Sequence, residues 1–62
     1  MKIEFMLRDD EGECILEKDG FEYIPTIGTE VWFIDGLDGE VKEYIYNLDS
    51  DCLIITCKQI NR

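Results

Sequence analysis

Apolar and polar residues alternate with a period of two along most of this chain. In residues 2–8 (KIEFMLR), Ile3, Phe5 and Leu7 fall on one side of an extended backbone, and mainly polar residues fall on the other. Such alternation is typical of a β-strand with one buried and one solvated face. After the turn-forming segment DDEGE, the same pattern predicts a second strand over residues 14–18.

Three further strands are predicted over residues 29–35 (TEVWFID), 40–47 (EVKEYIYN) and 52–60 (CLIITCKQI). The segments GLDG and LDSD between them contain the Gly, Asp and Ser residues that favour turns. Residues 21–24 also alternate and predict an extended segment, which Pro25 ends because proline cannot donate a ladder hydrogen bond. The pattern therefore predicts strands and turns, and no helix.

This arrangement predicts an all-β fold, because strands spaced by about ten residues with turns between them are typical of a small barrel or sandwich. We expect a five-stranded antiparallel, strongly bent sheet that forms a small SH3-like barrel. An OB-like barrel is the second choice, because that fold is usually longer. The 62 residues are expected to form one domain, residues 1–62. A core of this size rarely supplies more than about 3–5 kcal/mol, so self-association or a partner would add stability.

The four residues VWFI (31–34) leave the strand's orientation open. Either the pair that contains Trp32 or the pair that contains Phe33 faces the core, and a shift of one residue in register exchanges them. If Trp32 is outside, we expect it to form an apolar patch with Tyr44 or Tyr46, rimmed by carboxylates. Trp and Tyr are common anchors at interfaces. The alternative is a core strand that is covered on both faces.

Acidic residues dominate the charge: 15 Asp and Glu against 6 Lys and Arg give a net charge of −9. Direct binding to nucleic acid or to an anionic membrane is disfavoured, because both rely on Lys and Arg. A basic protein surface is favoured as partner, while solubility alone is the simpler explanation of the charge. The carboxylates expected to contact a partner are Asp9, Asp10, Glu11, Glu13, Glu40, Glu43, Asp49 and Asp51.

The composition argues against an enzyme. The chain contains no histidine, so Ser–His and Cys–His nucleophile pairs are excluded. Asp49 and Asp51 form a carboxylate pair around Ser50, but an exposed loop does not supply the desolvation that would shift their pKa values. No catalytic residue is therefore predicted.

Metal and cofactor sites are not predicted either. Cys52 and Cys57 are five residues apart on one predicted strand, so they point to opposite faces and cannot share a zinc ion. Cys14 is expected to be a small buried apolar residue, together with one of the other two. The acidic loops lack the ligand spacing of a calcium-binding loop.

The location is expected to be cytoplasmic. Three cysteines, an odd number, argue against a disulfide framework and fit a reducing compartment. The longest apolar runs have four residues, which predicts neither a secretory signal nor a transmembrane helix.

Residues 24–60 carry a resemblance to known proteins. Pro25 and Gly28 close a turn, an apolar strand follows, a glycine hairpin leads to Gly-Glu-Val at residues 39–41, and Ile54 begins the Ile-Ile pair of the last strand. This pattern resembles a broad group of small, uncharacterised SH3-like β-barrel proteins of bacteria and phages. The resemblance implies a barrel in a bacterial cell, with a phage or mobile element as one origin, and it transfers no catalytic residue.

Two hypotheses about function follow. The first is a non-enzymatic, acidic protein-interaction module. Its sharper form is an inhibitor of the phage or mobile-element type that docks on a nucleic-acid-binding surface as a DNA mimic, since DNA is a dense line of negative charge. The second is a self-associating small β-barrel that acts as an assembly subunit or binds a small ligand.

Overall fold

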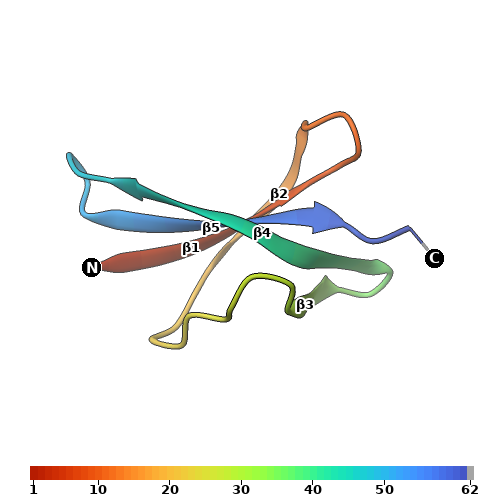
Figure 1. Ribbon diagram of the computed structural model, residues 1–62, viewed down its shortest axis with the longest axis horizontal. Helices are drawn as coiled ribbons and strands as arrows, with labels where there is room; N and C mark the ends of the chain where they lie inside the picture. The colour runs from red at the N-terminus through yellow and green to blue at the C-terminus, as the bar shows by residue number, and fades with distance from the viewer. Residues whose placement is uncertain (62) are drawn as a thin grey trace.

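The computed structural model describes residues 1–61 and contains five β-strands. They are β1 (Lys2–Arg8), β2 (Cys14–Asp19), β3 (Glu30–Ile34), β4 (Leu37–Asn47) and β5 (Cys52–Gln59). Together they form one sheet in the order β2-β1-β5-β4-β3, curled into a half-barrel (Figure 1). The all-β class and the strongly bent five-stranded sheet are confirmed, and the half-barrel is compatible with a small barrel. Within the described range, no helix is long and apolar enough to cross a membrane.

One strand pair departs from the antiparallel expectation. Three of the four pairs are antiparallel, but β1 and β5 run parallel, so the sheet is mixed. The backbone N–H of Lys2 donates to the carbonyl of Asp51 at 3.0 Å and begins this pairing. The first and last strands are thus neighbours in the middle of the sheet, and β2 and β3 form its two edges.

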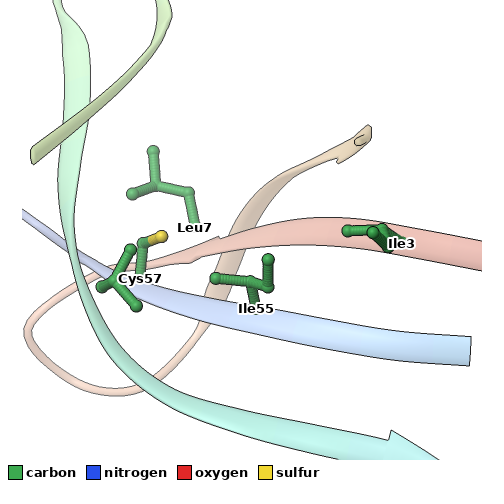
Figure 2. Close-up of a cluster of buried hydrophobic side chains, with 5 residues drawn as sticks. Ile3, Leu7, Ile55 and Cys57 are labelled. Atoms are coloured by element: carbon green, nitrogen blue, oxygen red, sulfur yellow. The ribbon is translucent and has the colours of Figure 1, made fainter. Parts of the chain in front are cut away.

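The concave face of the sheet carries the core. Pairing of β1 with β5 places Leu7 beside Cys57, and Cys57 in turn pairs with Val41 of β4. Figure 2 shows that the labelled side chains of β1 and β5 point to the same side of their two strands. The buried cluster consists of Ile3, Leu7, Val41, Ile55 and Cys57.

Gly39 of β4 allows the sheet to curl tightly around Leu7. A Cβ atom at Gly39 would lie 2.6 Å from Cδ1 of Leu7 and 3.0 Å from the carbonyl oxygen of Lys58. A side chain there would force Leu7 or the backbone at Lys58 to shift, because real Cβ atoms essentially never lie within 3.0 Å of another heavy atom. The missing side chain lets the fully buried Leu7 reach from β1 across β5 to the backbone of β4.

The orientation of β3 is decided by its pairing with β4. Val31 lies opposite Gly39, so Val31 and Phe33 face the concave side, where Phe33 packs edge-on against Phe5 with ring centroids 6.4 Å apart. Trp32 lies on the convex side and is 72% exposed. Of the two predicted alternatives, the one with Phe33 inside is correct.

Two predicted boundaries are wrong. β4 begins at Leu37, so the turn before it is Asp35–Gly36, with φ of 79° at Gly36, rather than the whole segment GLDG. Residues 21–24 form no strand. The N–H of Gly20 still donates to the carbonyl of Ile3 at 2.7 Å, and the pairing of β1 with β2 does not continue beyond this hydrogen bond.

Candidate partner-binding surfaces

The acidic segment between β1 and β2 is a tight turn held by its own side chains. The Asp9 carboxylate accepts hydrogen bonds from the backbone N–H groups of Glu11 and Glu13, both at 2.9 Å. Arg8 donates to the carbonyl of Gly12 at 2.7 Å, and Gly12 has a φ of 86° that few other residues adopt. The turn interpretation of this segment is confirmed, and the Asp9 carboxylate closes the turn.

This turn reaches the convex face of β4 and β5 through Asp10. Its carboxylate lies 3.7 Å from the ammonium of Lys58, while Lys42 pairs with Glu40 at 3.1 Å. Open pockets of about 280 and 290 Å³ lie among these side chains and Glu43. We call Asp10, Glu40, Lys42, Glu43 and Lys58 the mixed-charge group. Each ion pair here is exposed, so it contributes little to stability.

The second acidic turn joins β4 to β5. The Tyr46 hydroxyl donates to the Asp51 carboxylate at 2.5 Å. This hydrogen bond lowers the pKa of Asp51 and raises the pKa of Tyr46. The N–H of Asp49 donates to the side chain of Asn47 at 3.0 Å. The second acidic turn contains two predicted contact residues, Asp49 and Asp51. The Asp51 carboxylate is already engaged as the acceptor of the Tyr46 hydroxyl.

The predicted carboxylates lie in separate places. The first acidic turn follows Arg8 at one end of β1, and its Asp10 contacts Lys58, the partner of Arg8 on β5. Asp51 lies at the other end of β1, where its carbonyl accepts a hydrogen bond from Lys2. Lys2 and Arg8 are six residues apart along the strand, which corresponds to about 20 Å. The structure therefore brings Asp10 to Glu40 and Glu43, and it keeps Asp49 and Asp51 apart from them.

The predicted patch of Trp32 with Tyr44 or Tyr46 does not form. Trp32 is on the convex face, whereas Tyr44 and Tyr46 pair with Ile55 and Leu53, whose side chains face the concave side. The Tyr44 hydroxyl donates to the carbonyl of Pro25 at 2.7 Å. The physical reason is a bulge: the register shifts between Val41 and Glu43, and the extra residue, Lys42, exchanges the two faces of β4 beyond it.

A different apolar surface lies where the half-barrel opens, between the end of β2 and the edge strand β3. An open pocket of about 270 Å³ is found there. Phe21, which lines it, is 87% exposed. We call its apolar lining the seam: Phe5, Phe21, Val31, Trp32 and Phe33. The sequence predicts Trp32 as a contact residue. It does not predict the seam, because the seam forms only where the end of β2 and the edge strand β3, which are far apart in sequence, lie side by side.

The charged side chains that line the seam pocket are one acid, Asp19, and one base, Lys18. Two further acids are close to the seam residues in sequence: Glu22 follows Phe21, and Glu30 precedes Val31. The seam is thus an apolar surface with two strongly exposed aromatics, Phe21 and Trp32, on a protein whose net charge is −9.

The cysteines are arranged differently from the prediction. Cys14 is exposed, because it begins the edge strand β2, and both Cys52 and Cys57 are buried. Burial raises the pKa of Cys57 to about 11 and also raises that of Cys52, whose thiol lies 3.4 Å from the Glu4 carboxylate. Cys52 and Cys57 lie on opposite faces, as predicted, because Cys52 pairs with Lys2 and Cys57 pairs with Leu7. Within residues 1–61, no cluster of three or more potential ligands could hold a metal ion.

Apolar exposure is large for a chain this compact. The accessible surface of 4341 Å² is close to the value of about 4,200 Å² expected for 7.3 kDa. Among the described residues, however, 12 large apolar side chains are exposed and only 6 apolar residues are buried. No protein-family model, curated protein or solved structure matches this chain. Its surfaces are therefore the basis for a functional argument.

Proposed function

We propose that this protein is a non-enzymatic protein-interaction module that binds a basic surface of a partner protein through the seam. The observation that carries the proposal is an open pocket lined by the exposed aromatic residues Phe21 and Trp32, on a protein with a net charge of −9. Interfaces commonly combine a few buried aromatic anchors with a polar rim. Exposed apolar surfaces with polar residues at their margin commonly mark contact sites.

The net charge of −9 supports a basic partner. Charge of one sign steers a partner of the opposite sign toward the molecule before contact and disfavours acidic competitors. The aromatic side chains then supply affinity at short range, where the carboxylates alone would be screened by salt. Charge attraction and aromatic contact thus have different roles, and raised salt or substitution of the aromatics separates them by experiment.

The sharper form of the proposal, an inhibitor of the phage or mobile-element type that acts as a DNA mimic, remains a prediction. Duplex DNA presents one negative charge for about every 1.7 Å of its axis. Here the two acidic turns are about 20 Å apart. Lys42 and Lys58 also lie among the acids of the mixed-charge group. These features favour contact through the apolar seam over contact through a continuous line of negative charge. If the mimic prediction is correct, the protein will displace DNA from a basic DNA-binding partner in competition.

Self-association is the alternative, and the seam also supports it, because a second copy would bury the same aromatics. The negative charge on each copy opposes it. Sedimentation at micromolar concentration separates the two functions. A stable monomer supports the interaction module, and a dimer or tetramer supports the self-associating barrel.

The proposed function is tested by affinity capture with the intact chain as bait, from a bacterial lysate, at low and at raised salt. We expect the bound proteins to be basic and to be released by salt. They should also be lost when Phe21→Ala and Trp32→Ala are combined, but retained by Leu48→Ala. Leu48 is the matched control because it is 82% exposed and lies in the turn between β4 and β5. Binding only of acidic or neutral proteins, or binding insensitive to salt, would contradict the proposal.

A further inference from the structure

We infer that β3 is a strand-addition site, where a short extended segment of the partner pairs with the free edge of the sheet and lies in the seam. This inference rests on the proposed function, because it assumes a basic protein partner. Beyond the proposed function, the inference specifies which strand of this protein binds, the extended conformation of the bound segment, and the pattern of side chains along that segment.

The two edges of the sheet differ in how they discourage pairing with another chain. β2 (CILEKD) ends in three charged residues, and charges on an edge strand oppose pairing. β3 (EVWFI) has four apolar residues after Glu30 and contains neither lysine nor proline. A register shift between Trp32 and Ile34 limits its regular part to residues 30–32. We therefore expect a short added strand at β3 and none at β2.

The faces of β3 specify the side chains of the added strand. Side chains on an extended segment alternate between the two faces of the sheet. On the concave side they would lie beside Val31 and Phe33, so apolar residues fit there. On the convex side they would lie beside the exposed ring of Trp32. Lysine or arginine fits there, through a cation–π contact with the ring and through attraction to the net charge of −9. The bound segment should thus alternate apolar and basic residues.

A second copy of this chain is a poor occupant of the site. The five residues of β3 include no lysine or arginine, so a copy of the strand brings no cation to the Trp32 ring. The net charge of −9 on each copy adds general repulsion. Charge complementarity therefore favours a basic partner.

The probe is an eight-residue peptide of alternating lysine and valine with blocked ends, and the matched probe replaces each lysine with glutamate. Binding to the intact protein is followed by NMR, with hydrogen exchange of backbone amides. We expect the basic peptide to bind and to slow exchange at least about tenfold at β3 amides, without the same effect at β2. The acidic peptide should not bind.

Two variants of equal net charge sharpen the test. Trp32→Lys places a lysine on the exposed face of β3, and Ile15→Lys places one at an exposed position of β2. We expect Trp32→Lys to weaken binding of the basic peptide by at least about tenfold, as for an interface anchor. Ile15→Lys should change it less than about twofold, which also controls for the change in total charge.

Three results would overturn the inference. They differ in whether they also bear on the proposed function or on self-association. If the basic peptide binds but perturbs only the acidic turns and leaves β3 exchange unchanged, strand addition is wrong while the basic partner stands. If no binding of the basic peptide is detected, the strand addition is contradicted, and the affinity capture described above decides separately whether the proposed function stands. If β3 is protected without peptide and the protein sediments as a dimer, the occupant is a second copy.

Discussion

The side chains around Leu7 and those around Trp32 are covered to very different extents. At Leu7, strands β1, β5 and β4 pack closely together, and Gly39 lacks the side chain that would keep them apart. We call this the closed region, formed by the buried cluster Ile3, Leu7, Val41, Ile55 and Cys57 together with Gly39. At Trp32, the sheet ends, and the aromatics of the seam lie beside an open pocket. The comparison separates two kinds of apolar residue: those of the first region are buried and stabilise the fold, and those of the second are exposed and are proposed as a surface for contact.

The largest effect is expected from Leu7→Ala. Truncating a buried leucine costs about 2–5 kcal/mol. A core of this size supplies only about 3–5 kcal/mol in total, so the substitution removes most of the stability. We expect a largely unfolded chain by far-UV circular dichroism at 25 °C. The matched control, Leu48→Ala, should change the free energy of unfolding by less than about 0.5 kcal/mol. If the two variants unfold at the same urea concentration, the closed region is not the source of stability.

Gly39→Ala should destabilise the closed region by overpacking, at a cost of about 1–3 kcal/mol. The new Cβ would meet the backbone carbonyl of Lys58 as well as Leu7. Gly20→Ala is the comparison at the seam, where the atoms met belong to the side chains of Phe5 and Ile3. Side chains beside an open pocket can move aside, so we expect the smaller loss there. Urea titration of both variants measures the difference, and an equal or larger loss at Gly20 would contradict it.

Removing the exposed aromatics should hardly affect the fold. We expect the double variant of Phe21→Ala and Trp32→Ala to change the free energy of unfolding by no more than about 1 kcal/mol, since each exposed substitution contributes about 0.5 kcal/mol or less. Chemical denaturation followed by circular dichroism measures it. A loss as large as that of Gly39→Ala would show that the seam belongs to the core, and its proposed function would have to be withdrawn.

A smaller effect is expected from the hydrogen bond between Tyr46 and Asp51. The pKa of Asp51 is lowered in the folded state, so its contribution to stability is present above the ordinary value of 3.8 and is lost as the pH falls through the lowered value. The pKa of Tyr46 is raised, so its contribution is present below 10.0 and is lost as the pH rises through the raised value.

The wild type should therefore be more stable than Tyr46→Phe between these limits and equal to it at either extreme. Thermal unfolding at a series of pH values measures this difference, and Tyr23→Phe, at an exposed tyrosine, serves as the control. A difference between wild type and Tyr46→Phe that is constant down to pH 2 would rule out the contact with the Asp51 carboxylate.

The smallest perturbation is thiol labelling at pH 8, which should leave the fold intact. Cys14 is exposed and should react rapidly with a disulfide reagent. Cys52 and Cys57 should react only on unfolding, because both are buried and both have a raised pKa. Cys14→Ser should abolish the rapid reaction. Rapid reaction of Cys57, which belongs to the buried cluster, would mean that the closed region opens readily.

Much of the fold could be predicted from local patterns. Alternation located β1 and β2 to within one residue, and the Asp and Gly residues of the first turn have the roles that their chemistry indicates. The prediction failed for residues 21–24, which alternate like a strand but have no ladder partner. It failed for Cys14 because the pattern does not tell which strand becomes an edge.

The candidate site was less predictable than the fold. Trp32 and the tyrosines of β4 have the spacing of a shared face, and the extra residue at Lys42 places them on opposite faces. The two acidic turns resemble each other in composition, yet the order of strands holds them about 20 Å apart. The local pattern of apolar and polar residues predicts neither the bulge nor the order of the strands.

The sequence by itself determined the strand period, the turns, the absence of histidine and the net charge of −9, because these depend on each residue and its near neighbours. The tertiary structure alone decided that β1 and β5 are parallel neighbours, that β3 is an edge, and that Phe21 and Trp32 border one pocket. These properties depend on which distant segments pair and in which register. A one-residue change in register moves every side chain of a strand to the other face.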